Sequence, residues 1–199
     1  MEIKAFLEEL EQDARVRFIP VILDDSAKIL IETLNEINAK SILEIGTAIG
    51  YSGIMMLDAR KNATLDTIEI NSERYAEAQN NFAKAQVSAR VNSFLGDSSN
   101  VLQQLKQNKY DFIFLDGAKS DYKTYLPILI DMLTENGVIF ADNVFFKGMV
   151  LNDVVPRHKV RTMVVNLRQF IKLAQNTQLY NTVFLEAGDG IALIKKATK

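Results

Sequence analysis

Acidic and amide side chains stand at the ends of two predicted strands. Asp116 ends the strand predicted at 112–116, and Asp142, followed by Asn143, ends the strand predicted at 137–142. In an open parallel sheet, ligands bind outside the carboxyl ends of the strands. Carboxylate and amide oxygens are the donors that Mg²⁺ prefers, with water and substrate oxygens completing its shell. The pattern predicts a magnesium-type site; the alternative is that each residue only caps the segment that follows.

Lys119 lies three residues after Asp116. A lysine beside a divalent cation can lose its proton and act as a base. Lys119 is therefore a candidate base for this site, and a solvated loop lysine is the alternative.

A glycine-rich turn follows the first predicted strand, within the stretch SILEIGTAIGYS at 41–52. Its glycines, Gly46 and Gly50, predict a backbone that a ligand approaches closely at a strand-to-helix turn. The spacing is not GxGxxG, so the dinucleotide fingerprint matches poorly, and a purely structural turn is the alternative.

Two further strand ends suit a nucleotide-like ligand. Glu69 lies about 20 residues beyond the glycine-rich turn, where an acid can accept hydrogen bonds from ribose hydroxyls. Asp97 and Ser98 follow the third predicted strand and suit the edge of a base. Five adjacent strands thus deliver a hydrogen-bonding residue to one edge.

Strands and helices alternate along most of the chain. The predicted strands are 41–45, 65–70, 91–95, 112–116, 137–142, 182–186 and 191–195. The predicted helices are 2–17, 26–37 (capped by Asp25 or Ser26), 51–59, 72–85 (capped by Asn71 or Ser72), 97–107 and 122–133, and a further helix lies within 147–172. This alternation predicts a doubly wound α/β fold, a parallel sheet with helices on both faces. The Gly188-Asp189-Gly190 hairpin signal makes the last strand antiparallel.

Composition limits the class of protein. The chain has 199 residues, 48% hydrophobic and 24% charged, with a net charge of −2, which predicts one globular domain over 1–199 with residues 1–37 as N-terminal helices. There are no cysteines, which excludes disulfides and thiol chemistry. No apolar run reaches the roughly 18 residues of a membrane span, and the charged N-terminus does not match a signal peptide. We expect a cytoplasmic protein without membrane contact.

The ordered set of motifs resembles the cation-dependent O-methyltransferases of the catechol and caffeoyl-CoA type, which use S-adenosylmethionine. The matching stretches are LEIGTAIGYS, TIEIN, GDSS, FLDGAK and ADNV, and the likeness runs from about Ile19 to Lys196. The resemblance implies a class I, Rossmann-like methyltransferase fold: a seven-stranded, doubly wound, mostly parallel sheet whose last strand is antiparallel. It also implies S-adenosylmethionine and Mg²⁺, or another divalent cation, as cofactors.

The resemblance further implies the role of each motif residue. Lys119 takes the place of the general base, and the metal ligands are Asp116, Asp142 and Asn143. The methyl donor is expected to contact Ile22 and Ser52 at its methionine end, Glu69 at its ribose, and Asp97 and Ser98 at its adenine. Glu44, Gly46 and Asp116 complete the expected donor-binding set.

Within the family, the segments IPVI, DNVFFKGMV and EAGDGIALIKK look most like the enzymes that methylate 5-hydroxyuridine at the tRNA wobble position to 5-methoxyuridine. This likeness implies the tRNA anticodon loop as substrate and partner. The basic stretch 147–172 supplies candidate RNA contacts, namely Lys147, Arg157, Lys159 and Arg161. A solvated amphipathic helix is the alternative for this stretch. The family also implies a homodimer.

Three other functions compete with tRNA methylation. The first is O-methylation of small catechol or hydroxycinnamoyl-type substrates, which the same metal chemistry serves. The second is a nicotinamide-dependent oxidoreductase, which the missing GxGxxG and the paired Asp142-Asn143 disfavour. The third is a non-catalytic RNA-binding module, which Lys119 and the three metal-ligand positions disfavour.

Overall fold

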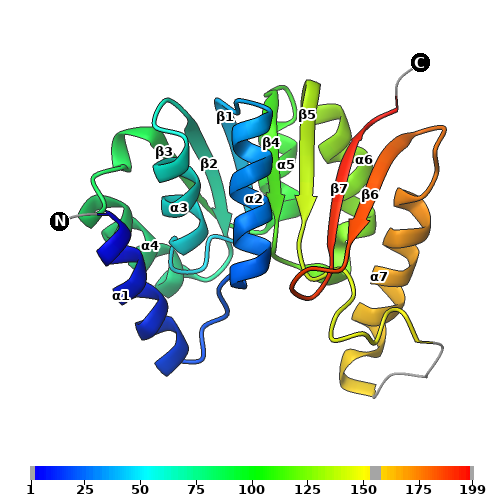
Figure 1. Cartoon of the computed structure of the whole chain (residues 1–199), viewed down its shortest axis with the longest axis horizontal. Coiled ribbons are helices and arrows are strands. Elements are labelled where there is room, and N and C mark those ends of the chain that lie inside the picture. The colour runs from blue at the N-terminus through cyan, green and yellow to red at the C-terminus, as the bar shows by residue number, and fades with distance from the viewer. Residues whose placement is uncertain (1–2, 153–157, 198–199) are drawn as a thin grey trace.

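Seven strands form one sheet in the order β3-β2-β1-β4-β5-β7-β6, with helices on both faces (Figure 1). The computed structural model describes residues 3–152 and 158–197, except the side chain of Lys159. The strands are β1 (Ser41–Ile45), β2 (Thr64–Glu69), β3 (Val91–Leu95), β4 (Tyr110–Leu115), β5 (Leu133–Ala141), β6 (Tyr180–Leu185) and β7 (Ile191–Lys196). β1 to β5 are parallel neighbours, and β7 runs antiparallel to both β5 and β6. The predicted sheet, including its antiparallel last strand, is confirmed.

The described residues form seven α-helices, of which the first two precede the first strand. They are α1 (Ile3–Val16), α2 (Asp24–Glu36), α3 (Tyr51–Ala59), α4 (Ser72–Lys84), α5 (Ser98–Leu105), α6 (Tyr122–Met132) and α7 (Arg161–Ala174). Short 3₁₀ turns lie at η1 (Ser88–Arg90), η2 (Lys119–Asp121) and η3 (His158–Val160). No helix in this described part of the chain is long and apolar enough to cross a bilayer.

The central strand β4 is buried on both faces, which explains its unbroken apolar sequence. Phe112 and Phe114 point into the core formed with α1 to α4, whereas Ile113 and Leu115 point into the core formed with α5, α6 and α7. All four side chains are fully buried. Because successive side chains of a strand alternate between faces, one apolar run serves two helical layers.

The N-terminus of α2 differs from the prediction. The helix begins at Asp24 after Leu23, and no side chain caps it, so the expected cap by Asp25 or Ser26 is wrong. The Ser26 hydroxyl instead donates to Asp142 Oδ1 at 3.2 Å. The cap predicted for α4 is confirmed, because the Asn71 side chain accepts hydrogen bonds from the backbone of the first turn.

β5 begins at Leu133, earlier than the predicted start at 137. An irregularity between Tyr110 and Phe112 shifts the register, so Leu133 pairs with Tyr110 and Val138 with Phe112. The polar residues 135–136, which resemble a turn in the sequence, lie exposed within the strand.

Candidate active site at the carboxyl edge of the sheet

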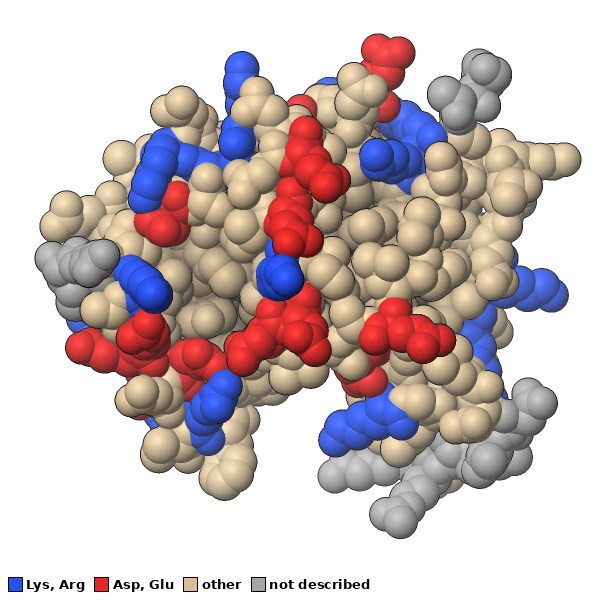
Figure 2. Space-filling view, in the orientation of Figure 1, with Lys and Arg blue, Asp and Glu red and all other residues tan. Residues whose placement is uncertain are grey.

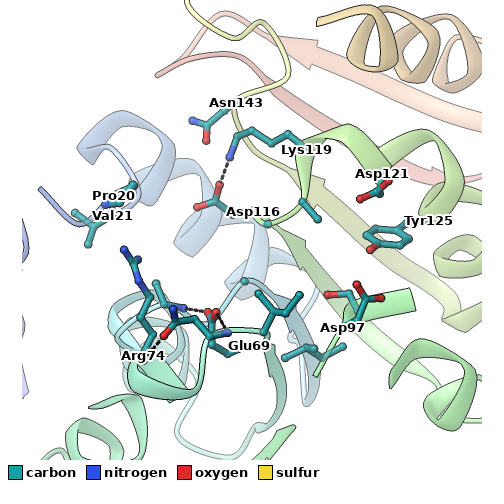
Figure 3. A pocket seen from close by; sticks show the side chains of 18 residues that line it. Pro20, Val21, Glu69, Arg74, Asp97, Asp116, Lys119, Asp121, Tyr125 and Asn143 are labelled. Carbon is teal, nitrogen blue, oxygen red and sulfur yellow. Dashed lines mark hydrogen bonds and ion pairs between the residues drawn. The ribbon is translucent and has the colours of Figure 1, made fainter. Parts of the chain in front are cut away.

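A cavity of about 470 Å³ lies at the carboxyl ends of the parallel strands (Figure 3). Backbone hydrogen bonds extend the sheet up to its wall: Gly46 N donates to Ile68 O, Asp116 N to Ile45 O and Asp142 N to Leu115 O, at 3.0, 3.1 and 3.0 Å. The strands therefore fix the positions of the residues that follow them. Of the predicted site residues, the cavity brings together Gly46, Glu69, Asp97, Ser98, Asp116, Lys119 and Asn143.

The Glu69 carboxylate is held in place by two backbone donors. Ala48 N donates to its Oε2 and Asn71 N to its Oε1, both at 2.8 Å. These bonds orient the carboxylate at the cavity wall, where each oxygen keeps a lone pair for a ligand hydroxyl. This geometry suits the binding of a ribose.

Gly46 and Gly117 bring two strand ends unusually close together. Gly46 has φ +103°, and a Cβ there would lie 2.9 Å from the Asp116 carbonyl oxygen. A Cβ on Gly117 would lie 3.1 Å from Gly46 Cα. Glycine is required at Gly46, because a side chain there would be strained at this φ and would clash with the Asp116 backbone, whereas a Cβ on Gly117 would be a tight contact at the cavity floor.

Lys119 and Asp116 form an ion pair inside the cavity. Lys119 Nζ lies 2.8 Å from Asp116 Oδ1, and both side chains are about one-fifth exposed, at 20% and 22%. Ala118 between them adopts φ +45°, which turns the chain so that Lys119 points back toward Asp116. Asn143, also left-handed with φ +56°, lies beside this pair (Figure 3).

Asp142 lies behind Asn143 and is 1% exposed. Its Oδ1 accepts hydrogen bonds from Ser26 Oγ at 3.2 Å and from Asn143 N at 2.9 Å. Its Oδ2 is buried without a hydrogen-bond partner. Burial and the nearby Asp116 carboxylate raise the pKa of Asp142 to about 6, and its hydrogen bonds and Lys119 only partly oppose this rise.

An unpartnered buried carboxylate oxygen beside a second carboxylate fits a hard cation, because such an atom is costly unless something neutralises it. The fit rests on two carboxylates and one amide. The described residues contain no group of three or more His, Cys, Asp or Glu side chains that could hold a metal ion. Water and acceptor oxygens would therefore have to supply the remaining ligands.

The far end of the cavity is formed by the start of α5 and by α6. Asp97 Oδ1 accepts a hydrogen bond from Ser99 N at 2.8 Å and so caps α5. Asp121 and Tyr125 line the cavity opposite Asp97 (Figure 3). A carboxylate, a hydroxyl and an aromatic ring at one end suit a purine base, which stacks on the ring and donates through its amino group.

Glu44 and Ser52 lie beneath the cavity floor. The Glu44 side chain is fully buried and accepts hydrogen bonds from Ser52 Oγ at 2.5 Å and from Thr67 Oγ1 at 2.6 Å. Burial raises the pKa of Glu44 to about 7, and the hydrogen bonds from the two hydroxyls oppose only part of this rise. The predicted donor contact Ile22 lines a neighbouring smaller cavity, at the start of α2. Ile22, Glu44 and Ser52 therefore stay predictions as donor contacts.

The predicted RNA-contacting residues are only partly described. Lys147 and Arg161 are exposed. Arg157 lies outside the described residues, and Lys159 lies in η3 with its side chain outside the description. Arg168, a further cation of this basic stretch, donates to the carbonyls of Val150 and Met149 at 3.2 and 3.0 Å and so holds the loop after β5.

Four polar residues of this region are not predicted as site residues from the sequence. Asn71, Arg74, Asp121 and Tyr125 line the cavity. Asn71, Arg74 and Asp121 lie within five residues after a predicted strand end, so a search of the first turn after each strand identifies them. Tyr125 lies nine residues after Asp116, within the helix that follows. Ser26 has no comparable signal, because its contact with Asp142 spans 116 residues.

Comparison with known proteins identifies the class. The family model described as O-methyltransferase matches residues 1–197. A catechol O-methyltransferase of Niastella koreensis is 34% identical over 164 residues, covering 78% of this chain and 72% of that protein. A caffeoyl-CoA O-methyltransferase of Citrus natsudaidai is 31% identical over 182 residues, covering 87% and 78%. The O-methyltransferase of Bacillus cereus, solved in complex with SAH, superposes with a TM-score of 0.85 at 25% identity, covering 96% of this chain and 90% of that one.

The fold is that of a class I S-adenosylmethionine-dependent methyltransferase, as the sheet order and the superposed structure show. This chain belongs to the O-methyltransferase family. It is therefore an S-adenosylmethionine-dependent O-methyltransferase, and the predictions of enzyme class and family are confirmed.

Proposed function

We propose that the protein transfers the methyl group of S-adenosylmethionine to one of two adjacent oxygens of a small catechol- or hydroxycinnamoyl-type acceptor, with the help of a divalent cation. The observation that carries this proposal is the buried, unpartnered Asp142 Oδ2 next to the Asp116–Lys119 pair. Asp116 and Lys119 line a cavity whose other half suits a nucleoside, and Asp142 lies behind the lining residue Asn143.

The donor half of the site would position the sulfonium. Glu69 would accept from the ribose hydroxyls, because its carboxylate is already held by two backbone amides. Asp97 and Tyr125 would enclose the adenine. The close approach at Gly46 leaves the cavity floor free of side chains, so the methyl group can face Asp116 and Asn143. Holding both reactants in line supplies much of the catalysis in such a displacement.

The acceptor half would be formed by Asp116, Asp142, Asn143 and Lys119. A cation held by the first three would act as a Lewis acid and favour the ionised form of an acceptor hydroxyl. Lys119, directed toward Asp116, is positioned to take or orient the hydroxyl proton. Hydrogen bonds from Ser26 and from the Asn143 backbone hold Oδ1 of Asp142, so the orientation of its unpartnered Oδ2 is fixed as well.

Surface charge supports a small acceptor over RNA. Figure 2 shows a column of acidic side chains, interrupted by a cation, down the face where α2 lies in Figure 1. The exposed charged residues of this helix are Asp24, Asp25, Lys28, Glu32 and Glu36. Four acids against one lysine repel a phosphate backbone. The catechol and caffeoyl-CoA relatives support the same class of acceptor.

5-Hydroxyuridine at the tRNA wobble position is the second candidate acceptor. It presents the same adjacent oxygens, and the exposed Lys147 and Arg161 on the loop and helix after β5 favour it. Binding would require the base to be splayed out of the anticodon loop. Arg168 contributes less than the sequence suggests, because it is engaged with loop carbonyls.

The test compares acceptors directly with isotope-labelled donor and Mg²⁺. We expect methylation of a catechol and of a caffeoyl thioester, with little transfer to tRNA that carries 5-hydroxyuridine. The double variant Lys147→Glu with Arg161→Glu should leave the small-acceptor rates unchanged. Efficient transfer to tRNA alone, lost in that double variant, would favour the second candidate instead.

A further inference from the structure

Arg74 extends into the cavity from the first turn of α4. It lines the cavity together with Glu69 and Asn71, which lie at and just after the end of β2. Pro20 and Val21, from the segment between α1 and α2, also line the cavity. Figure 3 shows its side chain rising past Glu69, with the guanidinium group directed toward Val21. Arg74 thus closes the end of the cavity opposite Asp97 and Tyr125.

Within the described residues, the Arg74 guanidinium group forms no hydrogen bond or ion pair, whereas its backbone N–H donates to the Asn71 side chain. Lys119 is the other cation lining the cavity in this part of the chain, and it is paired with Asp116. Glu77, on the next turn of α4, is already held by two hydrogen bonds from Arg17, at 2.5 and 2.8 Å. Arg74 makes only the smallest contribution to the lowered pKa of that carboxyl. A half-buried arginine without a partner is suited to binding an anion.

The order of groups along the cavity identifies the anion. If adenine lies at Asp97 and ribose at Glu69, the remaining charged end of the donor is its methionine tail, which carries a carboxylate. That tail continues away from Asp97, toward Arg74. Ala48 offers only a methyl group there, so space is left for a ligand. Ser52, the expected contact for this end, donates its hydroxyl to the buried Glu44 instead.

We propose that Arg74 binds the α-carboxylate of the methyl donor and so makes the site selective for ligands that carry the amino-acid tail. Arginine suits this role because its planar donors match a carboxylate in two parallel hydrogen bonds. This inference rests on donor binding as described above, and it does not depend on the identity of the acceptor.

Calorimetry with two ligands tests the inference without turnover. S-Adenosylhomocysteine carries the amino-acid tail, whereas 5′-methylthioadenosine keeps the adenosine and thioether but lacks the tail. For Arg74→Ala we expect S-adenosylhomocysteine to bind roughly tenfold or more weakly, with 5′-methylthioadenosine unchanged within about twofold. Arg74→Lys should recover part of the loss. Lys84→Ala, which removes an exposed cation from the other end of α4, should change neither affinity.

Three results would overturn the inference. If Arg74→Ala binds S-adenosylhomocysteine as tightly as the wild type, Arg74 does not contact the tail. If the affinities for both ligands fall equally, Arg74 contacts the adenosine or supports the fold. A thermal melt distinguishes these two cases, because only a role in the fold lowers the Tm. If the wild type binds neither ligand, donor binding itself is wrong, and the proposed function falls together with this inference.

Discussion

The Ser26 hydroxyl in the first turn of α2 lies 3.2 Å from Asp142 Oδ1, across 116 residues of sequence. It orients a carboxylate whose other oxygen has no partner. The contact is also crowded, because a Cβ on Gly188 would lie 2.3 Å from Ser26 Oγ. The N-terminal helices and the β6–β7 hairpin therefore meet at the residue that we assign to the cation.

Removing that hydroxyl tests its positioning role. Ser26→Ala should lower the free energy of unfolding by about 1 kcal/mol, the usual net value of one hydrogen bond. It should also raise the Mg²⁺ concentration needed for half-maximal activity several-fold, since Asp142 loses one orienting donor. A Mg²⁺ titration of the initial rate measures this. An unchanged Mg²⁺ requirement would mean that Asn143 N alone fixes the carboxylate.

Cation binding should appear as thermal stabilisation even without substrates. A ligand that binds only the folded state raises its stability, by about 2.7 kcal/mol at 100 times its Kd. At about pH 8, where Asp142 with a pKa of about 6 is ionised, Mg²⁺ should raise the Tm of the wild type. Asp142→Asn should lose this shift, whereas the exposed control Glu73→Gln should keep it. Equal shifts in the wild type and Asp142→Asn would exclude Asp142 as a ligand.

Glu44 predicts a pH dependence of stability with a definite sign. Burial raises its folded pKa from 4.5 to about 7, so the folded state binds a proton more tightly than the unfolded state. Its stabilising contribution is full below about pH 4.5 and is lost as the pH rises to about 7. Glu44→Gln should remove this loss and, near pH 8, be more stable than the wild type by on the order of 1–3 kcal/mol.

Denaturant melts of both proteins between about pH 5 and 8 measure the difference. Asp142 titrates in the same direction, so the quantity to compare is the variant minus the wild type, in which the Asp142 contribution cancels. A difference that does not change with pH would show that Glu44 is not protonated in this range.

Lys119 should act in the chemical step and not in donor binding. Lys119→Met should lower kcat by roughly 10²–10⁴-fold, the range typical of a lost general base, with the affinity for S-adenosylhomocysteine kept within about threefold. Lys119→Arg keeps the positive charge beside Asp116 but cannot accept a proton at neutral pH. Lys123→Met, on the next turn, serves as the control. Full activity in Lys119→Arg would assign Lys119 an electrostatic role only.

Local patterns predicted most of the sheet because its strands are short apolar runs with clear ends. The strands 41–45 and 91–95 and the helix 51–59 match the structure residue for residue. β5 was predicted too short, since its early pairing depends on the register shift against β4. No local pattern reports such a shift, because it is set by the neighbouring strand.

The strand-end residues were predictable from the sequence, but which of them line the cavity and which are buried beneath it was not. Topology alone brings Glu69, Asp116 and Asn143 to one cavity. Glu44, in contrast, is fully buried and bonded to Ser52, so it lies beneath the cavity floor. The role of Ser26 depends on a contact between distant segments, which spacing along the chain does not encode.

The most direct test of the account is methyl transfer to a catechol before and after removal of the cation. The wild type with S-adenosylmethionine and Mg²⁺ should give the mono-O-methylated product, detected by mass spectrometry. A chelator should abolish the product, and added Mg²⁺ in excess should restore it. Undiminished product in the presence of the chelator would contradict the assignment of Asp116, Asp142 and Asn143 as the cation site and the mechanism built on it.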